Sequence, residues 1–102
     1  MSSYTVYVSP QAYRDIDETY EYIKTELFAE DAALILVEDI EEAIFSLEEL
    51  PERGAERKVG AYAYKGYRQL FSKNYTIVYR VDTDAKEVMI ITARYSHRNF
   101  LN

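Results

Sequence analysis

Two apolar stripes with helical spacing, separated by only a few residues, constrain the fold of this chain more than any other feature. The stripes are Ala12, Tyr13, Ile16, Tyr20, Ile23 and Leu27, and then Ala33, Leu36, Val37, Ile40, Ala43, Ile44, Leu47 and Leu50. Spacings of three and four predict two helices of about 18 to 20 residues. Ser9 can cap the first helix ahead of Pro10, and Pro51 should end the second because proline disfavours helical geometry in the residue before it. The short link at residues 28–30 makes the pair an antiparallel hairpin.

Strand patterns flank this hairpin on both sides. Residues 4–8 alternate in polarity, as expected for a short half-buried strand. Residues 52–60 show no periodicity and predict an exposed loop. The further predicted strands, joined by links of hairpin length, are 67–72, 75–82 and 87–93. The order β-α-α-β-β-β predicts a single α+β domain over residues 1–102, in which the hairpin covers one face of a small, mainly antiparallel sheet and leaves the other face uncovered.

Length and composition fit one globular domain of 102 residues, 48% of them hydrophobic. No run of ~18 apolar residues is present that could span a bilayer, and the N-terminus lacks the pattern of a secretory signal. We therefore expect no membrane role and a cytoplasmic location. The absence of cysteine excludes disulfides, thiolate metal sites and cysteine nucleophiles.

Charge is distributed very unevenly along the chain, whose net charge is -6. Residues 11–50 carry 13 acidic and two basic side chains, whereas residues 51–102 carry ten basic and five acidic ones. The hairpin is therefore acidic and the sheet half basic. A solvated acidic helix surface explains the first half without any ligand. The basic half could hold an acidic partner, including nucleic acid.

Several standard chemistries do not fit the sequence. Gly54, Gly60 and Gly66 match neither nucleotide-binding fingerprint. One histidine without cysteine cannot form the usual zinc sites, and no spacing indicates a serine triad. We expect no metal and no cofactor. Chemistry on a phosphodiester remains open, since it needs cations for the phosphate and groups that exchange protons.

The uncovered face of the predicted sheet is the candidate site. Its expected titratable groups are Lys65, Arg68, Lys73, Arg80, Arg94, His97 and Arg98. Tyrosines are interleaved with these cations, and a tyrosine beside an arginine can stack a nucleobase while its phosphate is held. Tyrosine is also a common strand residue that packs against its neighbours without any ligand. Both interpretations remain open from the residues alone.

The order of these motifs resembles a known family. The segments that carry the resemblance are Pro51-x-x-Gly54, Gly66-Tyr67-Arg68-x-Leu70, Asn74-Tyr75-x-Ile77-x-Tyr79-Arg80-Val81 and Tyr95-Ser96-His97-Arg98-Asn99-Phe100. In this order, and over nearly the whole chain, they look like the RelE/ParE superfamily of toxins from bacterial type II toxin–antitoxin modules. The resemblance implies a growth-arresting toxin that a cognate antitoxin silences in a hetero-oligomeric complex.

The resemblance leaves the target open. RelE-like members cut messenger RNA on the ribosome without metal, whereas ParE-like members poison DNA gyrase, and a diverged member could merely bind its antitoxin. For RNA cleavage the resemblance implies Arg68 on the phosphate and Arg98 at a basic position after the last strand. It also implies His97 as acid or base and Tyr95 in place of a C-terminal catalytic tyrosine. The supporting cations would be Arg57, Lys58, Lys65, Lys73, Arg80 and Arg94. Arg68, His97 and Arg98 slightly favour ribosome-dependent RNA cleavage, while the acidic hairpin favours a protein target such as gyrase.

An antitoxin is also expected from surface chemistry. An open edge strand and the apolar residues Phe100 and Leu101 would be liabilities if nothing covered them. A partner segment that adds a strand or lays a helix in a groove would cover both.

Overall fold

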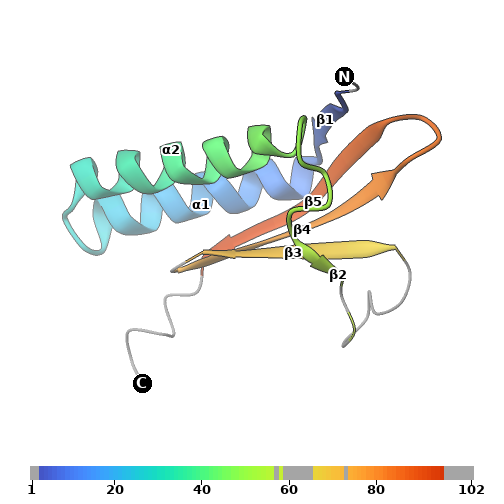
Figure 1. Ribbon diagram of the computed structural model, residues 1–102. Helices are drawn as coiled ribbons and strands as arrows, with labels where there is room; N and C mark the ends of the chain where they lie inside the picture. Colours follow the sequence, from blue (N-terminus) through green and yellow to red (C-terminus); the bar gives the residue numbers. More distant parts are fainter. Residues whose placement is uncertain (1–2, 57, 59–65, 73, 96–102) are drawn as a thin grey trace.

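The fold is a two-layer arrangement of a helical hairpin on a five-stranded sheet (Figure 1). The computed structural model describes residues 3–56, 58, 66–72 and 74–95. The elements are β1 (Thr5–Val8), α1 (Pro10–Thr25), α2 (Glu30–Ser46), β2 (Ala55–Glu56), β3 (Tyr67–Ser72), β4 (Tyr75–Asp82) and β5 (Glu87–Tyr95). In the sheet the order is β1-β5-β4-β3-β2, with β1 parallel to β5 and the other pairs antiparallel. The predicted α+β class and element order are confirmed.

The core lies between the hairpin and one face of the sheet. Ile40 and Ile44 of α2, and Leu47 just after it, are buried together with alternate residues of the central strands, including Tyr79 and Ile90. Because side chains alternate between the faces of a strand, the residues between these core positions lie on the uncovered side. No helix among the residues described is both long enough and apolar enough to cross a bilayer.

Ser9 connects the start of α1 to β5 through hydrogen bonds of its hydroxyl. Its hydroxyl accepts a hydrogen bond from the Ala12 N–H at 3.1 Å, as predicted for an N-cap, and donates to the Ile91 carbonyl at 2.8 Å. Ile91 lies at a β-bulge, since Thr92 pairs with Val78 while Ile90 pairs with Tyr79. The Ser9 hydroxyl therefore also gives a hydrogen-bond partner to the Ile91 carbonyl, which the bulge in β5 removes from the regular pairing with β4.

Both helices end earlier than predicted. α1 ends at Thr25 rather than at about Leu27, and α2 ends at Ser46, well before Pro51. The Leu47 and Glu48 N–H groups each bond a carbonyl three residues back. This is the tighter 3₁₀ pattern, and it ends the α-helix at Ser46. Pro51 therefore follows the helix without ending it.

The buried stripe of α1 also differs from the apolar pattern. Tyr13 is exposed, whereas the polar residues Asp15 and Thr19 are buried. α1 lies along β5, where the Asp15 carboxylate accepts a hydrogen bond from the Ala93 N–H at 3.2 Å. Asp15 thus satisfies a backbone donor beyond the end of β1. Leu50 of the second stripe is likewise exposed.

The predicted loop at 52–60 contains the short edge strand β2, which pairs with β3. Gly54, just before β2, fits a space that admits no side chain. A Cβ there would lie 2.6 Å from the Gln69 carbonyl oxygen and 2.7 Å from the Tyr79 hydroxyl. Backbone on one side and a buried ring on the other leave little room to adjust.

We therefore expect Gly54→Ala to lower the free energy of unfolding by about 3 kcal/mol through overpacking. Gly66→Ala is the matched control, because its φ of 84° is strained for alanine but an added Cβ meets nothing within 4 Å among the described residues. That variant should lose only about 1 kcal/mol. Urea unfolding measures both, and equal losses would contradict the steric account of Gly54.

Candidate functional site

A row of side chains crosses the uncovered face of the sheet, and we call it the cross-strand row. It consists of Tyr67 on β3, Arg80 on β4, Met89 on β5 and Tyr7 on β1, and adjacent members are directly opposed in the strand register. Their sequence neighbours Val6, Val8, Tyr79, Val88 and Ile90 belong to or pack against the core on the hairpin side. The row therefore faces away from the helices.

The centre of the row is a cation beside an aromatic ring. The Arg80 guanidinium carbon lies 6.0 Å from the centroid of the Tyr67 ring, within the range of a cation–π contact. Arg80 is exposed, and Met89 and Tyr7 on its other side are 41% and 45% exposed. Phe71, which is 64% exposed, extends the same face along β3. The surface can hold an anionic group at Arg80 while flat or apolar groups pack beside it.

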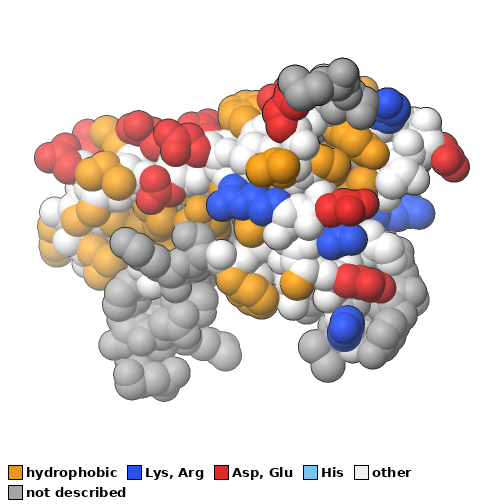
Figure 2. Space-filling view, viewed as in Figure 1, with side chains coloured by type: hydrophobic (Ala, Val, Ile, Leu, Met, Phe, Trp, Pro, Cys, Tyr) orange, Lys and Arg blue, Asp and Glu red, His pale blue; other side chains and the backbone are white. Residues whose placement is uncertain are grey.

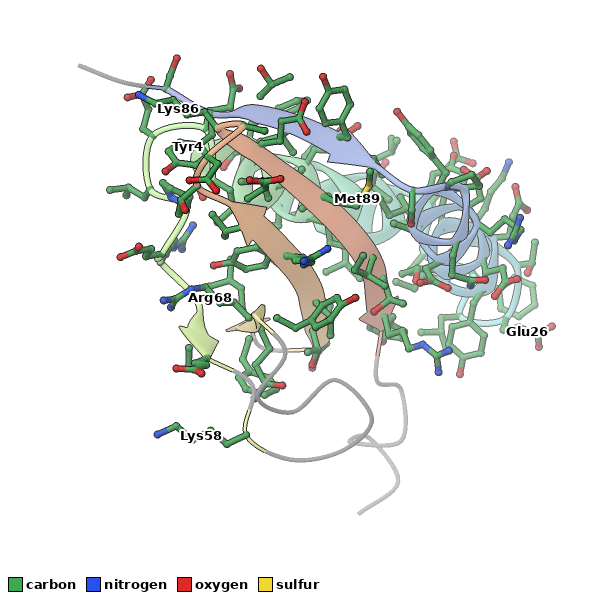
Figure 3. All side chains as sticks on the ribbon, turned by 90° about the vertical axis from the view of Figure 1, so that its right-hand side faces the viewer. Tyr4, Glu26, Lys58, Arg68, Lys86 and Met89 are labelled. Carbon is green, nitrogen blue, oxygen red and sulfur yellow. The ribbon has the colours of Figure 1, made fainter. Side chains whose placement is uncertain are left out.

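Arg68 does not lie on this face, so its expected placement is wrong. It is opposed to Tyr79, whose ring is fully buried on the hairpin side. Its guanidinium donates to the Gly54 carbonyl at 2.7 Å, and the Gly54 N–H donates to the Tyr79 hydroxyl at 2.8 Å. Figure 3 shows Arg68 beside the segment that leads into β2, on a different strand from Met89. Arg68 thus ties the edge of the sheet to the core.

The Tyr79 hydroxyl belongs to the same buried network. Burial raises the pKa of Tyr79 above its ordinary value of 10.0, although the Gly54 hydrogen bond and the Arg68 charge oppose the shift. A raised pKa means that the folded state retains this proton more tightly than the unfolded state. The contribution of the protonated Tyr79 hydroxyl to stability is complete below the pKa of this group in the unfolded state. It is lost as the pH rises through the higher pKa of the folded state.

We therefore expect stability to fall as the pH rises above about 10, and to fall less steeply in Tyr79→Phe. Urea unfolding at about pH 8 and about pH 11 measures the difference between the two proteins. Tyr95→Phe is a useful comparison, since burial and then Tyr22 raise the pKa of Tyr95 too. Identical slopes in the parent protein and Tyr79→Phe would rule out this role for the Tyr79 proton.

Tyr95 and Arg94 lie at the far end of β5, next to α1. The Tyr95 ring centroid is 6.1 Å from that of Tyr22. Arg94 and Tyr95 line a groove of about 420 Å³ together with Asp15 and other residues of α1. Sequence reasoning missed Asp15 because the pattern assigned only apolar residues to the buried stripe. The burial of Asp15 could have been suspected only by knowing that β1 stops pairing with β5 at Ile90, because this leaves the Ala93 N–H without a strand partner on that side.

The remaining predicted site residues are only partly placed. Lys58 is exposed just beyond β2. The predicted residues Arg57, Lys65, Lys73, His97 and Arg98, and the apolar pair Phe100 and Leu101, lie outside the described residues. Of the cations expected on the uncovered face, the structure therefore places Arg80 at its centre and moves Arg68 to the other side. The roles implied for these residues in catalysis stay predictions.

Comparison with known proteins gives one family and two similar folds. The model of the family described as the ParE toxin of type II toxin–antitoxin system, parDE, matches residues 6–100. A chain of the chromosomal ParDE toxin–antitoxin system from P. aeruginosa superposes with a TM-score of 0.73 at 24% identity, covering 93% of this chain and 98% of that one. A chain of the RelBE2 toxin–antitoxin complex from Mycobacterium tuberculosis gives 0.66 at 21% identity, covering 91% and 98%. At these identities the likeness concerns the fold. Comparison with curated proteins gives no match.

Proposed function

Because this chain belongs to the family of ParE toxins of type II toxin–antitoxin systems, we propose that it arrests bacterial growth by binding DNA gyrase, and that it does so without cleaving nucleic acid. The cross-strand row is the proposed contact surface for this protein target. A cognate antitoxin would hold the toxin silent until it is released.

The placement of Arg68 and Arg80 on opposite faces of the sheet carries this choice of target. RNA cleavage as implied by the sequence would draw Arg68 together with other cations around one phosphate. Arg68 instead bonds the Gly54 carbonyl on the hairpin side, while Arg80 stands with Tyr67 on the uncovered face. Arginine, tyrosine and methionine are enriched in protein interfaces, and arginine and tyrosine are also enriched among the residues that dominate the binding energy. The cross-strand row has that composition.

An antitoxin partner is supported by the similar folds, both of which come from toxin–antitoxin systems. The match covers 98% of each of the two chains. We therefore expect this chain to be recovered as a hetero-oligomer when it is co-expressed with the product of the adjacent small gene. Recovery of the two proteins separately under native conditions would contradict this expectation.

Ribosome-dependent RNA cleavage is the second candidate, and one observation favours it. Arg80 beside Tyr67 could hold a phosphate next to a stacked base. In that case Arg80 would act in the phosphate contact, and His97 and Arg98 would supply proton transfer and further charge.

Induction of the toxin in a bacterium separates the two functions. Gyrase poisoning should leave messenger RNA intact, trap gyrase–DNA breaks and induce the response to DNA damage. RNA cleavage should stop translation and leave new RNA ends inside reading frames, which sequencing of RNA 5′ ends detects. Cut messages without DNA breaks would overturn the gyrase proposal.

A further inference from the structure

The outer face of α2 is apolar and acidic at once, and its side chains Leu34, Glu38, Glu41 and Phe45 are exposed. With ~100° between successive residues, Leu34, Glu38, Glu41 and Phe45 fall on one side of the helix. Ala33, Ile40 and Ala43 fall on the opposite side and are buried. Leu34 is 45% exposed and Phe45 is 58% exposed, so this helix carries large apolar groups on both sides.

The charge of this face is entirely acidic. The acidic residues of α2 are Glu30, Asp31, Glu38, Asp39, Glu41 and Glu42, and the helix has no lysine or arginine. Glu38, Glu41 and Glu42 lie between Leu34 and Ile35 at one end and Phe45 at the other. Figure 2 shows acidic side chains gathered over the hairpin, with hydrophobic side chains among them. A partner that matches this pattern must be basic in its middle and apolar at its ends.

Phe28, in the connection before α2, is a second and independent observation. It is 91% exposed, and its φ of 51° lies in the left-handed region that favours glycine. Phe28 lies two residues beyond the C-cap Glu26, and the Ala29 N–H that follows it bonds back to the Ile23 carbonyl. Glycine adopts such a left-handed conformation without a steric cost. A bulky side chain that is almost fully exposed contributes little packing to offset the cost of the left-handed backbone at this residue.

We propose that the outer face of α2, with Phe28 at the tip of the hairpin, is a docking surface for a basic amphipathic helix of a partner protein. From Leu34 to Phe45 the face extends ~16 Å, about three helical turns. A partner helix of that length can place lysine or arginine against Glu38, Glu41 and Glu42 and apolar side chains against both ends. The concentration of carboxylates disfavours a second copy of the same acidic helix. This inference does not depend on gyrase being the target.

A charge-swap experiment with the full-length toxin tests the proposal. The probe is a fluorescent synthetic helical peptide of 18 residues, with lysines at its central contact positions and leucine or phenylalanine at its ends. Glu38→Lys combined with Glu41→Lys should weaken binding at least ~10-fold, and a peptide carrying glutamates in place of the lysines should bind this variant better than the parent protein. Asp17→Lys combined with Glu21→Lys is the matched control, because it makes the same charge change at exposed positions of α1.

Phe28→Gly separates docking from folding. It should raise the melting temperature by roughly 4 °C, since glycine relieves the left-handed backbone. The same variant should bind the lysine peptide several-fold more weakly. The proposal would be overturned if Glu38→Lys combined with Glu41→Lys left the affinity for the lysine peptide unchanged. It would also be overturned if the control, Asp17→Lys combined with Glu21→Lys, lost as much affinity. A toxin that dimerises through this face and loses the dimer in Ile35→Lys would overturn it too.

Discussion

Replacing Arg80 by glutamate is expected to lower the potency of growth arrest by about 30-fold or more. A residue at the centre of an interface typically contributes 2 kcal/mol or more to binding, and ~1.4 kcal/mol corresponds to a factor of ten. Arg80 has this position, since it lies between Tyr67 and Met89 in the strand register and contacts the Tyr67 ring. Reversal of its charge should weaken target binding without disturbing the core on the other face.

Toxin titration against growth, together with the concentration that half-inhibits gyrase, measures the effect. Lys86→Glu is the matched control, because Lys86 is an exposed cation in the turn between β4 and β5 and the charge change is the same. That variant should retain nearly full potency. If Arg80→Glu kept its potency, or if the two variants lost equal potency, the cross-strand row would not be the contact surface.

Replacing Tyr79 by alanine is expected to lower the free energy of unfolding by about 3 to 5 kcal/mol. The Tyr79 ring is among the largest fully buried side chains, and its hydroxyl accepts the Gly54 N–H. Alanine would leave both a cavity and an unpaired buried donor. Since a domain of this size is stable by only about 5 to 15 kcal/mol, much of the protein could unfold.

Tyr79→Phe separates the two contributions, because it keeps the ring and removes only the hydroxyl. It should lower the free energy of unfolding by about 1 to 3 kcal/mol. Urea titration of the parent protein and both variants, each co-expressed with the antitoxin and then separated from it, measures the two losses. Similar losses in the alanine and phenylalanine variants would mean that the ring contributes little to packing.

Much of the fold follows from local patterns in the sequence. The Ser9-Pro10 start of α1 and the hairpin were predictable because capping and periodicity act over a few residues. The helix ends were not predictable from local patterns. They depend on how the chain after each helix packs against the rest of the fold, which the sequence near the helix end does not encode. Burial of Asp15 escaped prediction as well. It depends on β1 ending early, which exposes the Ala93 N–H to α1.

The placement of Arg68 could have been found from the sequence. A two-residue link between β3 and β4 makes Ser72 oppose Tyr75, and counting back makes Arg68 oppose Tyr79. Once Tyr79 is recognised as part of the core, Arg68 must share its side. Alternation along one strand is therefore not enough to decide which residues of two neighbouring strands share a face. The length of the link between the strands is also needed, because it sets which residues are opposed. The same counting does not extend to His97 and Arg98, which lie beyond the predicted strand 87–93 and outside the described residues.

The most direct test of the account is a supercoiling assay with purified gyrase, the wild-type toxin and Arg80→Glu, run beside a translation reaction in which the ends of the messenger RNA are mapped. We predict that the wild-type toxin inhibits supercoiling and stabilises gyrase–DNA breaks, that Arg80→Glu does neither, and that the message stays intact with both. Cleavage of ribosome-bound message by the wild-type toxin while gyrase remains fully active would contradict the account.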